Sequence, residues 1–311
     1  MSSERYTSMF PPSAERPKSQ MHWMTELQSL LVILKITLPL SVWICLGAIF
    51  QAILLLLPLS SIIKYWRFYA TLPAVLFILA KSLNTVLISC NIIKNPYLPH
   101  QSLWNKRVTA LVPDKAGNFP NIDEPPNKNK VAVLILGATV NHPGGYLTAP
   151  HADKFVELSD RMFNELDVLP QEETGFLGQS TLYQHNPSGT VDSYLISYWR
   201  SIESIHNYAV SPAHTDAVNW WNRESKNNGL KHIGIMHEIF EAPAGMWETV
   251  YLNFEPTMMG ATSYLKKADE KGVVGGTVAD MWVSPVVDAS RGKLRSSRGR
   301  LGWDARRDGR E

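Results

Sequence analysis

The sequence contains few cysteines and no marked excess of charge of one sign. Only Cys45 and Cys90 occur among 311 residues, and both lie in apolar runs near the N-terminus. The rest of the chain has no thiol, which excludes a disulfide framework, a cysteine-ligated metal site and a cysteine nucleophile there. The formal net charge is +2, with the basic excess mostly in the C-terminal tail. No basic stripe of the kind that binds phosphate backbones occurs, so no nucleic-acid partner is expected.

Phosphate-binding loops and metal-ligand sets are also missing. The glycine-containing turns at 137–145 and 272–276 match neither the P-loop pattern nor the dinucleotide-binding fingerprint. We therefore expect neither flavin nor nicotinamide. The remaining turn histidines, His142, His151 and His185, are too scattered to suggest a ligand set, and no metal site is predicted.

Two long apolar runs occupy the first third of the chain. Residues 36–57 contain Gln51 as the only strongly polar side chain, and a helix of that length crosses about 30 Å of hydrocarbon. Residues 68–93 are also long enough, but they carry Lys81 near the middle, which costs about 2.5–3.5 kcal/mol at mid-bilayer. This run either spans or lies as a re-entrant or interfacial hairpin. The sequence thus predicts a membrane anchor of one or two transmembrane helices at 36–93.

The segment before the anchor, residues 1–35, is polar or mixed and is not a signal peptide. The flanking Lys and Arg residues slightly favour placing both termini in the cytosol. We expect an endoplasmic reticulum membrane protein with its globular domain in the cytosol, in contact with membrane lipid.

Composition divides the rest of the chain into three segments. Residues 94–130 are rich in Pro, Asn and Lys and are typical of a linker that does not fold alone. A domain is expected at 131–262. Residues 263–311 form a C-terminal extension whose basic, Ser- and Gly-rich end from Ala289 is expected to be disordered, or else to touch anionic lipid headgroups.

Periodicity in the domain predicts alternating strands and helices. A buried strand at 131–138 precedes an amphipathic helix at 151–167. Two hairpins are predicted, one at 175–199 around a Pro-Ser-Gly turn and one at 232–256 around Pro-Ala-Gly. Between them, residues 202–226 are helical, with a new helix starting at Pro212. The order β-α-β-β-α-β with one appended strand predicts an α+β, ferredoxin-like fold.

A single sheet with helices on one face leaves its other face uncovered. The strands at 190–199 and 247–254 carry bulky residues on both faces, which is too much apolar surface to leave in water. A homodimer that closes the two sheets into an α/β barrel is predicted. The alternative is that the tail after Thr262, or the membrane helices, cover the sheet.

Two stretches carry a family resemblance: "YWRSIESIHNYAVSPAHTDAVNWWNR" (198–223) and "HIGIMHEIFEAPAGMWETVYLNFEPTMMGAT" (232–262). They resemble a monooxygenase-like family of dimeric α/β-barrel proteins, whose fungal members carry an N-terminal membrane anchor and often occur among secondary-metabolite genes. Relatives on this fold include cofactor-independent monooxygenases acting on quinol-like polyketides, haem-degrading enzymes and haem-binding aldoxime dehydratases. The resemblance implies an enzyme but names no reaction.

Three residues are candidates for catalysis. His237 and Glu238 are neighbours on a strand, so they point to opposite faces. His237 shares an apolar face, where it would serve as a general base, as a haem ligand, or only as a satisfied core residue. His214 lies in the first turn of a helix, whose dipole favours the neutral imidazole, although a solvated helix start explains it equally well. His206 has no such feature and is not a candidate.

Five residues are predicted to bind a flat apolar substrate: Tyr198, Trp199, Arg200, Asn141 and Tyr251. Aromatic residues alternating along a strand line apolar pockets, but they more often form core. Asn141, in the turn after the first strand, offers hydrogen bonds at the mouth of such a pocket, and ordinary turn chemistry is the alternative.

Together these observations predict a membrane-anchored tailoring enzyme acting on an apolar, polyketide-like intermediate. Oxygenation and a non-redox cyclisation, dehydration or isomerisation both remain open, as does a non-catalytic membrane scaffold for other biosynthetic enzymes. No cofactor is predicted, although haem stays open because one histidine suffices as its axial ligand.

Overall fold

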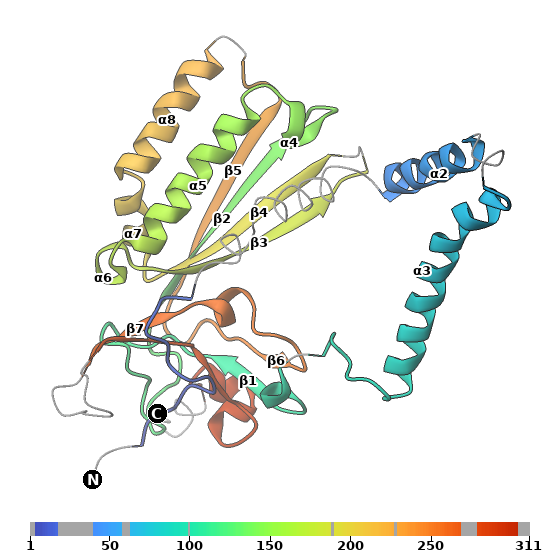
Figure 1. The fold of residues 1–311 in the computed structure, drawn as a ribbon. Coiled ribbons are helices and arrows are strands. Elements are labelled where there is room, and N and C mark those ends of the chain that lie inside the picture. Colours follow the sequence, from blue (N-terminus) through green and yellow to red (C-terminus); the bar gives the residue numbers. More distant parts are fainter. Residues whose placement is uncertain are drawn as a thin grey trace. The chain divides into compact units, whose positions relative to one another are not determined.

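The computed structural model describes residues 4–17, 40–57, 63–98, 100–187, 190–226, 229–268 and 279–303. The chain forms two compact units, one of residues 34–98 and one that combines 1–33 with 99–311 (Figure 1). We call them the helical unit and the catalytic unit, and each is described by itself.

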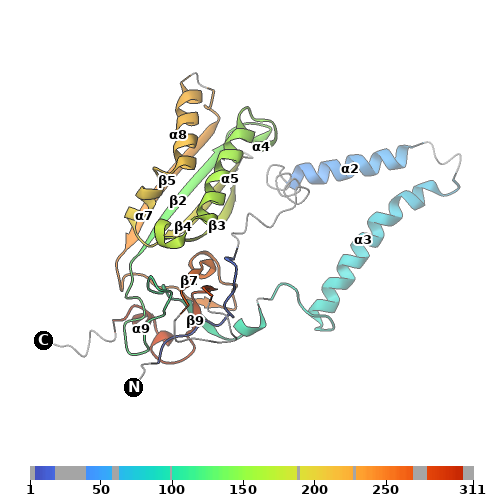
Figure 2. The same ribbon diagram turned by 60° about the vertical axis from the view of Figure 1, so that its left-hand side comes forward.

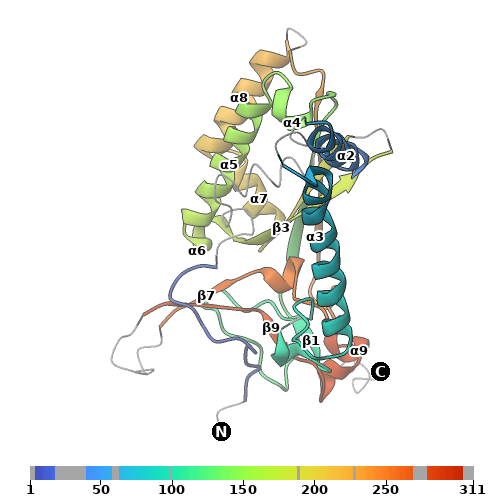
Figure 3. The ribbon, with the colours of Figure 1, turned by 45° about the vertical axis from the view of Figure 1, so that its right-hand side comes forward.

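The catalytic unit is built on a four-stranded antiparallel sheet in the order β3-β4-β2-β5. Helices α5, α7 and α8 belong to one layer, and Figures 2 and 3 show α5 and α8 on the same side of the sheet. The chain order β2-α5-β3-β4-α8-β5 with this strand order is the ferredoxin-like arrangement, which confirms the predicted α+β class. The bounds are β2 Val131–Val140, α5 Ala152–Val168, β3 Phe176–His185, β4 Val191–Trp199, α7 Ile202–Tyr208, α8 Pro212–Ser225 and β5 Ile233–Ala242.

The break between α7 and α8 follows from local chemistry. Ser211 caps α8, its Oγ accepting from the backbone N–H of His214 at 3.3 Å, and Pro212 occupies the first helical position. A proline there loses no intrahelical hydrogen bond. The predicted helix start at Pro212 is confirmed.

Strand register assigns each side chain of the sheet to a face. Ala132 pairs with Trp199, and both pack with Leu166 of α5, so they face the helices. Val133 pairs with Tyr198, and both pack in a second core on the opposite side. We call these the helix face and the open face.

The open face is covered at one end by the chain beyond β5. Met258 and Met259, both in the short helix η4 (Met258–Ala261), pack with Tyr198, Val133 and Leu177. Gly178, at a bulge in β3 with φ +148°, permits this approach, because a Cβ there would lie 3.1 Å from the Cα of Thr262. Tyr264 and Val283, which follow Thr262 in the chain, pack in the same core, so the alternative of a cover by the chain after Thr262 is realised in part.

The predicted linker at 94–130 is wrong from Arg107 onward. Strand β1 (Arg107–Ala110) pairs with β6 (Tyr251–Leu252) and β9 (Val286–Asp288) in a three-stranded sheet. Val108 and Leu111 are buried there. The same pairing corrects the second hairpin: β5 pairs with β2, and the segment 247–256 contributes only β6, to the smaller sheet. The partners of β1 lie far along the chain, so its local composition did not reveal them.

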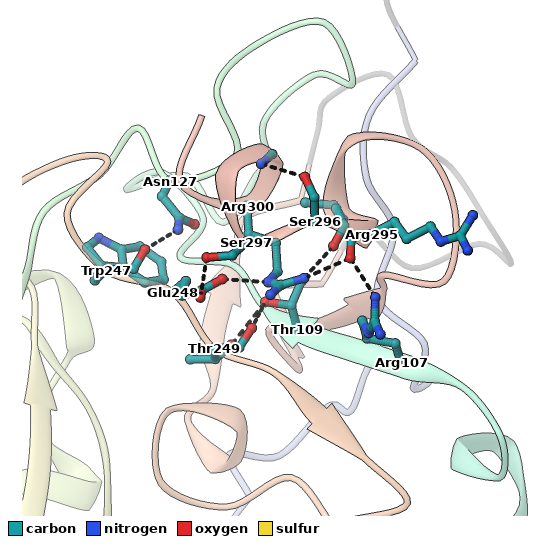
Figure 4. Close-up of polar contacts among 12 residues, drawn as sticks. Arg107, Thr109, Asn127, Trp247, Glu248, Thr249, Arg295, Ser296, Ser297 and Arg300 are labelled. Carbon is teal, nitrogen blue, oxygen red and sulfur yellow. Dashed lines mark hydrogen bonds and ion pairs between the residues drawn. The ribbon is translucent and has the colours of Figure 1, made fainter. Parts of the chain in front are cut away.

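The prediction that the tail from Ala289 is disordered is also wrong as far as Trp303. Strands β7 (Tyr264–Lys266) and β8 (Met281–Val283) pair, β9 follows, and η5 (Lys293–Arg295) and α9 (Ser297–Arg300) come last. Arg300 is 6 % exposed and its Nε donates to Glu248 Oε2 at 2.7 Å, while one terminal nitrogen donates to the carbonyl of Leu294 at 2.9 Å (Figure 4). Residues 304–311 lie outside the described part. The remaining short elements are η3 Gln101–Leu103, α4 Gly145–Thr148 and α6 Gln171–Thr174.

The helical unit contains α2 (Leu40–Leu56) and α3 (Trp66–Ser89). By length and composition α3 is able to cross a membrane, and none of its apolar window is buried, while the described apolar part of α2 is shorter. Gln51, the polar residue of the first run, donates from Nε2 to the Ala70 carbonyl of α3 at 3.1 Å. The indole of Trp66 donates to the Leu54 carbonyl at 2.8 Å. These two bonds join the helices.

Candidate active site

His237 and Glu238 do point to opposite faces of β5. His237 pairs with Leu136 and lies on the helix face, and Glu238 pairs with Ile135 on the open face. β5 is an edge strand, and both side chains are exposed. The expectation of an apolar pocket around His237 is therefore not met in this chain.

His214 lies on the inward side of α8, in line with Ala217 and Trp221, which pack into the core. The residue is half-buried, and its Nδ1 is buried without a hydrogen-bond partner in the described part of the chain. Leaving such a group unpaired costs about 1–3 kcal/mol. Buried polar groups without partners are rare and often mark a functional site.

The neighbours of His214 are already engaged. Its ring centroid lies 6.4 Å from that of Tyr208, edge to face. The Tyr208 hydroxyl donates to the Met162 carbonyl at 2.8 Å, and Ser211 Oγ donates to Glu165 Oε2 at 2.9 Å. Burial raises the pKa of Tyr208, and the nearby Glu165 carboxylate raises it further. Tyr208 thus stays neutral near neutral pH.

Apolar side chains are available in the same layer between helices and sheet. One cluster packs Leu166, Phe176 and Trp199, and another packs Leu158, Trp220 and Ile233. Leu136 and Ala138 of β2 also face the helices, yet they stay partly exposed and belong to neither cluster. An apolar ligand would therefore find uncommitted surface here. The sequence did not reveal this grouping, because its members come from separate elements.

Trp199 and Arg200, predicted to bind substrate, hold the fold. Trp199 is buried on the helix face, and its indole N–H donates to Ser197 Oγ at 2.9 Å. The guanidinium of Arg200 donates to the carbonyls of Pro113 at 2.7 Å and Asp114 at 2.9 Å. Their polar groups are occupied by the protein itself.

Tyr198 and Tyr251 meet on the covered part of the open face, together with Tyr264. The hydroxyl of Tyr251 donates to the Thr257 carbonyl at 2.9 Å and accepts from the Gly260 N–H at 2.9 Å. Burial raises the pKa of Tyr198 and that of Tyr264 to about 12 each. These phenols are neutral near neutral pH and form a core beside η4.

The raised phenol pKa values predict loss of stability at alkaline pH. Unfolded tyrosines ionise near pH 10, whereas Tyr198 and Tyr264 keep their protons to about pH 12 in the fold. The folded state then binds more protons, so the free energy of unfolding should fall by up to about 1.4 kcal/mol per pH unit per tyrosine over that window. Urea titrations from pH 8 to 11 on wild type and Tyr264→Phe measure this. An equal slope in the variant would contradict the assignment to Tyr264.

Asn141 shows turn chemistry. It is exposed, its backbone N–H donates to the His232 carbonyl at 2.7 Å, and its Oδ1 accepts from Thr139 Oγ1 at 3.4 Å. His142 Nδ1 accepts from the Gly144 N–H at 3.1 Å. Within the described ranges, no three His, Cys, Asp or Glu side chains gather in a way that would hold a metal ion.

Haem does not fit the two histidine candidates. His237 is exposed at a sheet edge, and the His214 ring stands against Tyr208, which packs in a core cluster with Trp199. A porphyrin needs an enclosed apolar slot on the ligand side of its axial histidine.

Comparison with known proteins shows which family the chain is related to. The sequence profile described as monooxygenase af470-like matches residues 131–259. Monooxygenase af470 of Aspergillus fumigatus is 31% identical over 270 residues, which cover 85% of this chain and 88% of that protein. Among solved structures, an aldoxime dehydratase in complex with butyraldoxime has a TM-score of 0.34 at 16% identity, covering 66% of this chain and 46% of that one. A cofactor-independent oxygenase from Streptomyces nogalater has a TM-score of 0.23 at 13% identity, covering 36% and 91%. Scores this low assign neither fold nor activity.

The ferredoxin-like sheet and the sequence relationship define a monooxygenase-like α+β protein. Within that class, the chain belongs to the monooxygenase af470-like family. The predicted resemblance is confirmed, and with it the prediction that the protein is an enzyme.

Proposed function

We propose that the protein is a membrane-anchored tailoring enzyme of fungal secondary metabolism that oxygenates an apolar, polyketide-like substrate with His214 as general base. The observation that carries this proposal is the buried, unpartnered Nδ1 of His214 on the inward side of α8. The fungal relative named as a monooxygenase supports the reaction class.

The proposed reaction requires two things from the protein, a general base and an apolar binding site. His214 removes a proton from an acidic carbon of the substrate, and the resulting carbanion supplies electrons to O₂. For a methylene group, R–CH₂–R′ + O₂ gives R–CO–R′ + H₂O, so the substrate is the reductant and no nicotinamide is required. Uncommitted Leu136 and Ala138 would contact the apolar body of the substrate.

A non-redox cyclisation, dehydration or isomerisation is the second candidate, because the same imidazole would perform its proton transfers. A deletion strain complemented with the wild-type gene under isotopically labelled O₂ separates the two. Oxygenation predicts that the deletion strain accumulates a precursor and that the complemented strain makes a product carrying one labelled oxygen. An unlabelled product would establish the second candidate, and unchanged metabolites in the deletion strain would leave only a scaffold role.

Membrane attachment is part of the proposal. The helical unit supplies one helix long enough to cross, in a unit whose apolar side chains are mostly exposed. Such a surface is stable in lipid and not in water. We place the protein in the endoplasmic reticulum membrane with the catalytic unit in the cytosol, and an apolar substrate would partition to the same membrane.

We also propose a homodimer through the part of the open face that η4 leaves bare. Met236 and Phe240 are 39% and 53% exposed there, beside Ile135 and Tyr194. The full-length protein in detergent should have twice the monomer protein mass by light scattering, and Phe240→Asp should halve it. Val210→Asp, at a more exposed apolar site after α7, should leave the mass unchanged. A wild-type monomer at micromolar concentration would contradict the dimer.

A further inference from the structure

The segment before the membrane run is built into the catalytic unit. The backbone N–H of Tyr6 donates to the Pro120 carbonyl at 3.2 Å, and that of Met9 donates to the Val286 carbonyl at 2.8 Å. Ser13 and Trp282 exchange two backbone hydrogen bonds of 2.8 and 2.7 Å. Residues 4–17 thus form hydrogen bonds with two separate segments of the catalytic unit, one near residue 120 and one near residues 282–286.

Arg16 fastens the end of this segment. Its guanidinium lies 5.1 Å from the ring centroid of Phe176 and 4.9 Å from that of Trp282. The same group donates to the carbonyls of Leu166 at 2.9 Å and Phe176 at 3.1 Å. Cation–π contacts of this kind contribute about 0.5–2 kcal/mol each, and hydrogen bonds from a charged group about 1.5–3. Arg16 is therefore held firmly in place.

In the sequence, the helical unit (residues 34–98) lies between Arg16 and the return to the catalytic unit at residue 99. We propose that the helical unit is an insertion in the catalytic unit and forms a hairpin that enters and leaves the membrane on the same side, crossing it twice. A single crossing would put Arg16 on one side of the bilayer and its partners Phe176 and Trp282 on the other. The inference rests on the membrane attachment proposed above.

The helical unit has the features of such a hairpin. Its 24-residue helix α3 spans about 36 Å. The run "KYWRFY" (64–69) at the start of α3 joins basic and aromatic side chains of the kind enriched at membrane interfaces. Lys94 and Tyr97 follow its other end. The bonds from Gln51 and Trp66 hold α2 against α3, and the first of them satisfies the polar group that would otherwise face lipid.

Cysteine labelling of the full chain tests the topology. In a background of Cys45→Ala and Cys90→Ala, single reporters are placed at the exposed positions Glu15, Lys64 and Arg291. Sealed microsomes are treated with a membrane-impermeant maleimide before and after permeabilisation, and a parallel sample is extracted with alkaline carbonate.

The hairpin predicts that Glu15→Cys and Arg291→Cys label equally without permeabilisation, and that Lys64→Cys labels only after it. Opposite accessibility of the Glu15 and Arg291 reporters would overturn the hairpin while leaving attachment intact. Labelling of all three in sealed microsomes would replace two crossings by an interfacial hairpin. Release of the protein by carbonate would overturn integral attachment itself.

Discussion

His214→Ala is expected to lower product formation by about 10²–10⁴-fold, the usual contribution of a positioned general base. The imidazole has one ring nitrogen enclosed without a partner, while its neighbours Tyr208, Glu165 and Ser211 are already hydrogen-bonded. Truncation removes the proton acceptor but little packing, because His214 is only half-buried. The measurement is product per unit of protein in microsomes carrying each variant.

Two other histidines serve as matched controls. His206→Ala on α7 should retain wild-type activity, because that side chain is exposed. His237→Ala should have a small effect, since it lies exposed on the edge strand. His214→Gln, which keeps a hydrogen-bonding side chain but no basic nitrogen, should be as inactive as His214→Ala. Full activity of His214→Gln would rule out the base, and a loss confined to His237→Ala would move it to β5.

Arg300→Ala should destabilise the catalytic unit by about 1.5–3 kcal/mol, the usual contribution of hydrogen bonds that involve a charged group. Arg300 is 6% exposed and ion-paired with Glu248 at 2.7 Å (Figure 4). Ser297 Oγ also donates to Glu248 at 2.7 Å, so the carboxylate fixes α9 through two residues. Losing the guanidinium leaves Glu248 and the Leu294 carbonyl without this donor.

Urea unfolding of the full chain in detergent measures this effect. Arg291→Ala, which removes the same charge at an exposed position, should change the free energy of unfolding by less than about 0.5 kcal/mol. Equal effects of the two variants would show that net charge, rather than the contacts of the buried guanidinium, matters at this end of the chain.

The four-stranded sheet was predictable because its signals are local. Alternating apolar residues mark β3 and β4, a helical stripe marks α5, and Ser211-Pro212 marks the start of α8. The three-stranded sheet was not predictable, because β1, β6 and β9 are two to four residues long and both of its pairings join residues more than a hundred positions apart. "SSRGRLGW" looked disordered because Arg300 becomes structural only when Glu248 is beside it.

The candidate site, too, was predictable from the sequence only in part. The sequence placed His214 in the first turn of a helix, which is correct, but the neighbours that decide its role come from α5 and α7. For Trp199 and Arg200, residue type suggested ligand contact, whereas their hydrogen bonds go to the protein backbone and core. A strand pattern gives the face of a side chain, but not what covers that face.

The central claim is that His214 transfers a proton in an apolar site and that O₂ reacts without an added redox cofactor. The most direct measurement incubates the precursor accumulated by the deletion strain with detergent-purified, full-length protein in air, without nicotinamide or flavin. The account predicts conversion by wild type and His206→Ala, none by His214→Gln, and none by wild type without O₂. Conversion that requires added nicotinamide or flavin, or that proceeds equally with His214→Gln, would contradict it.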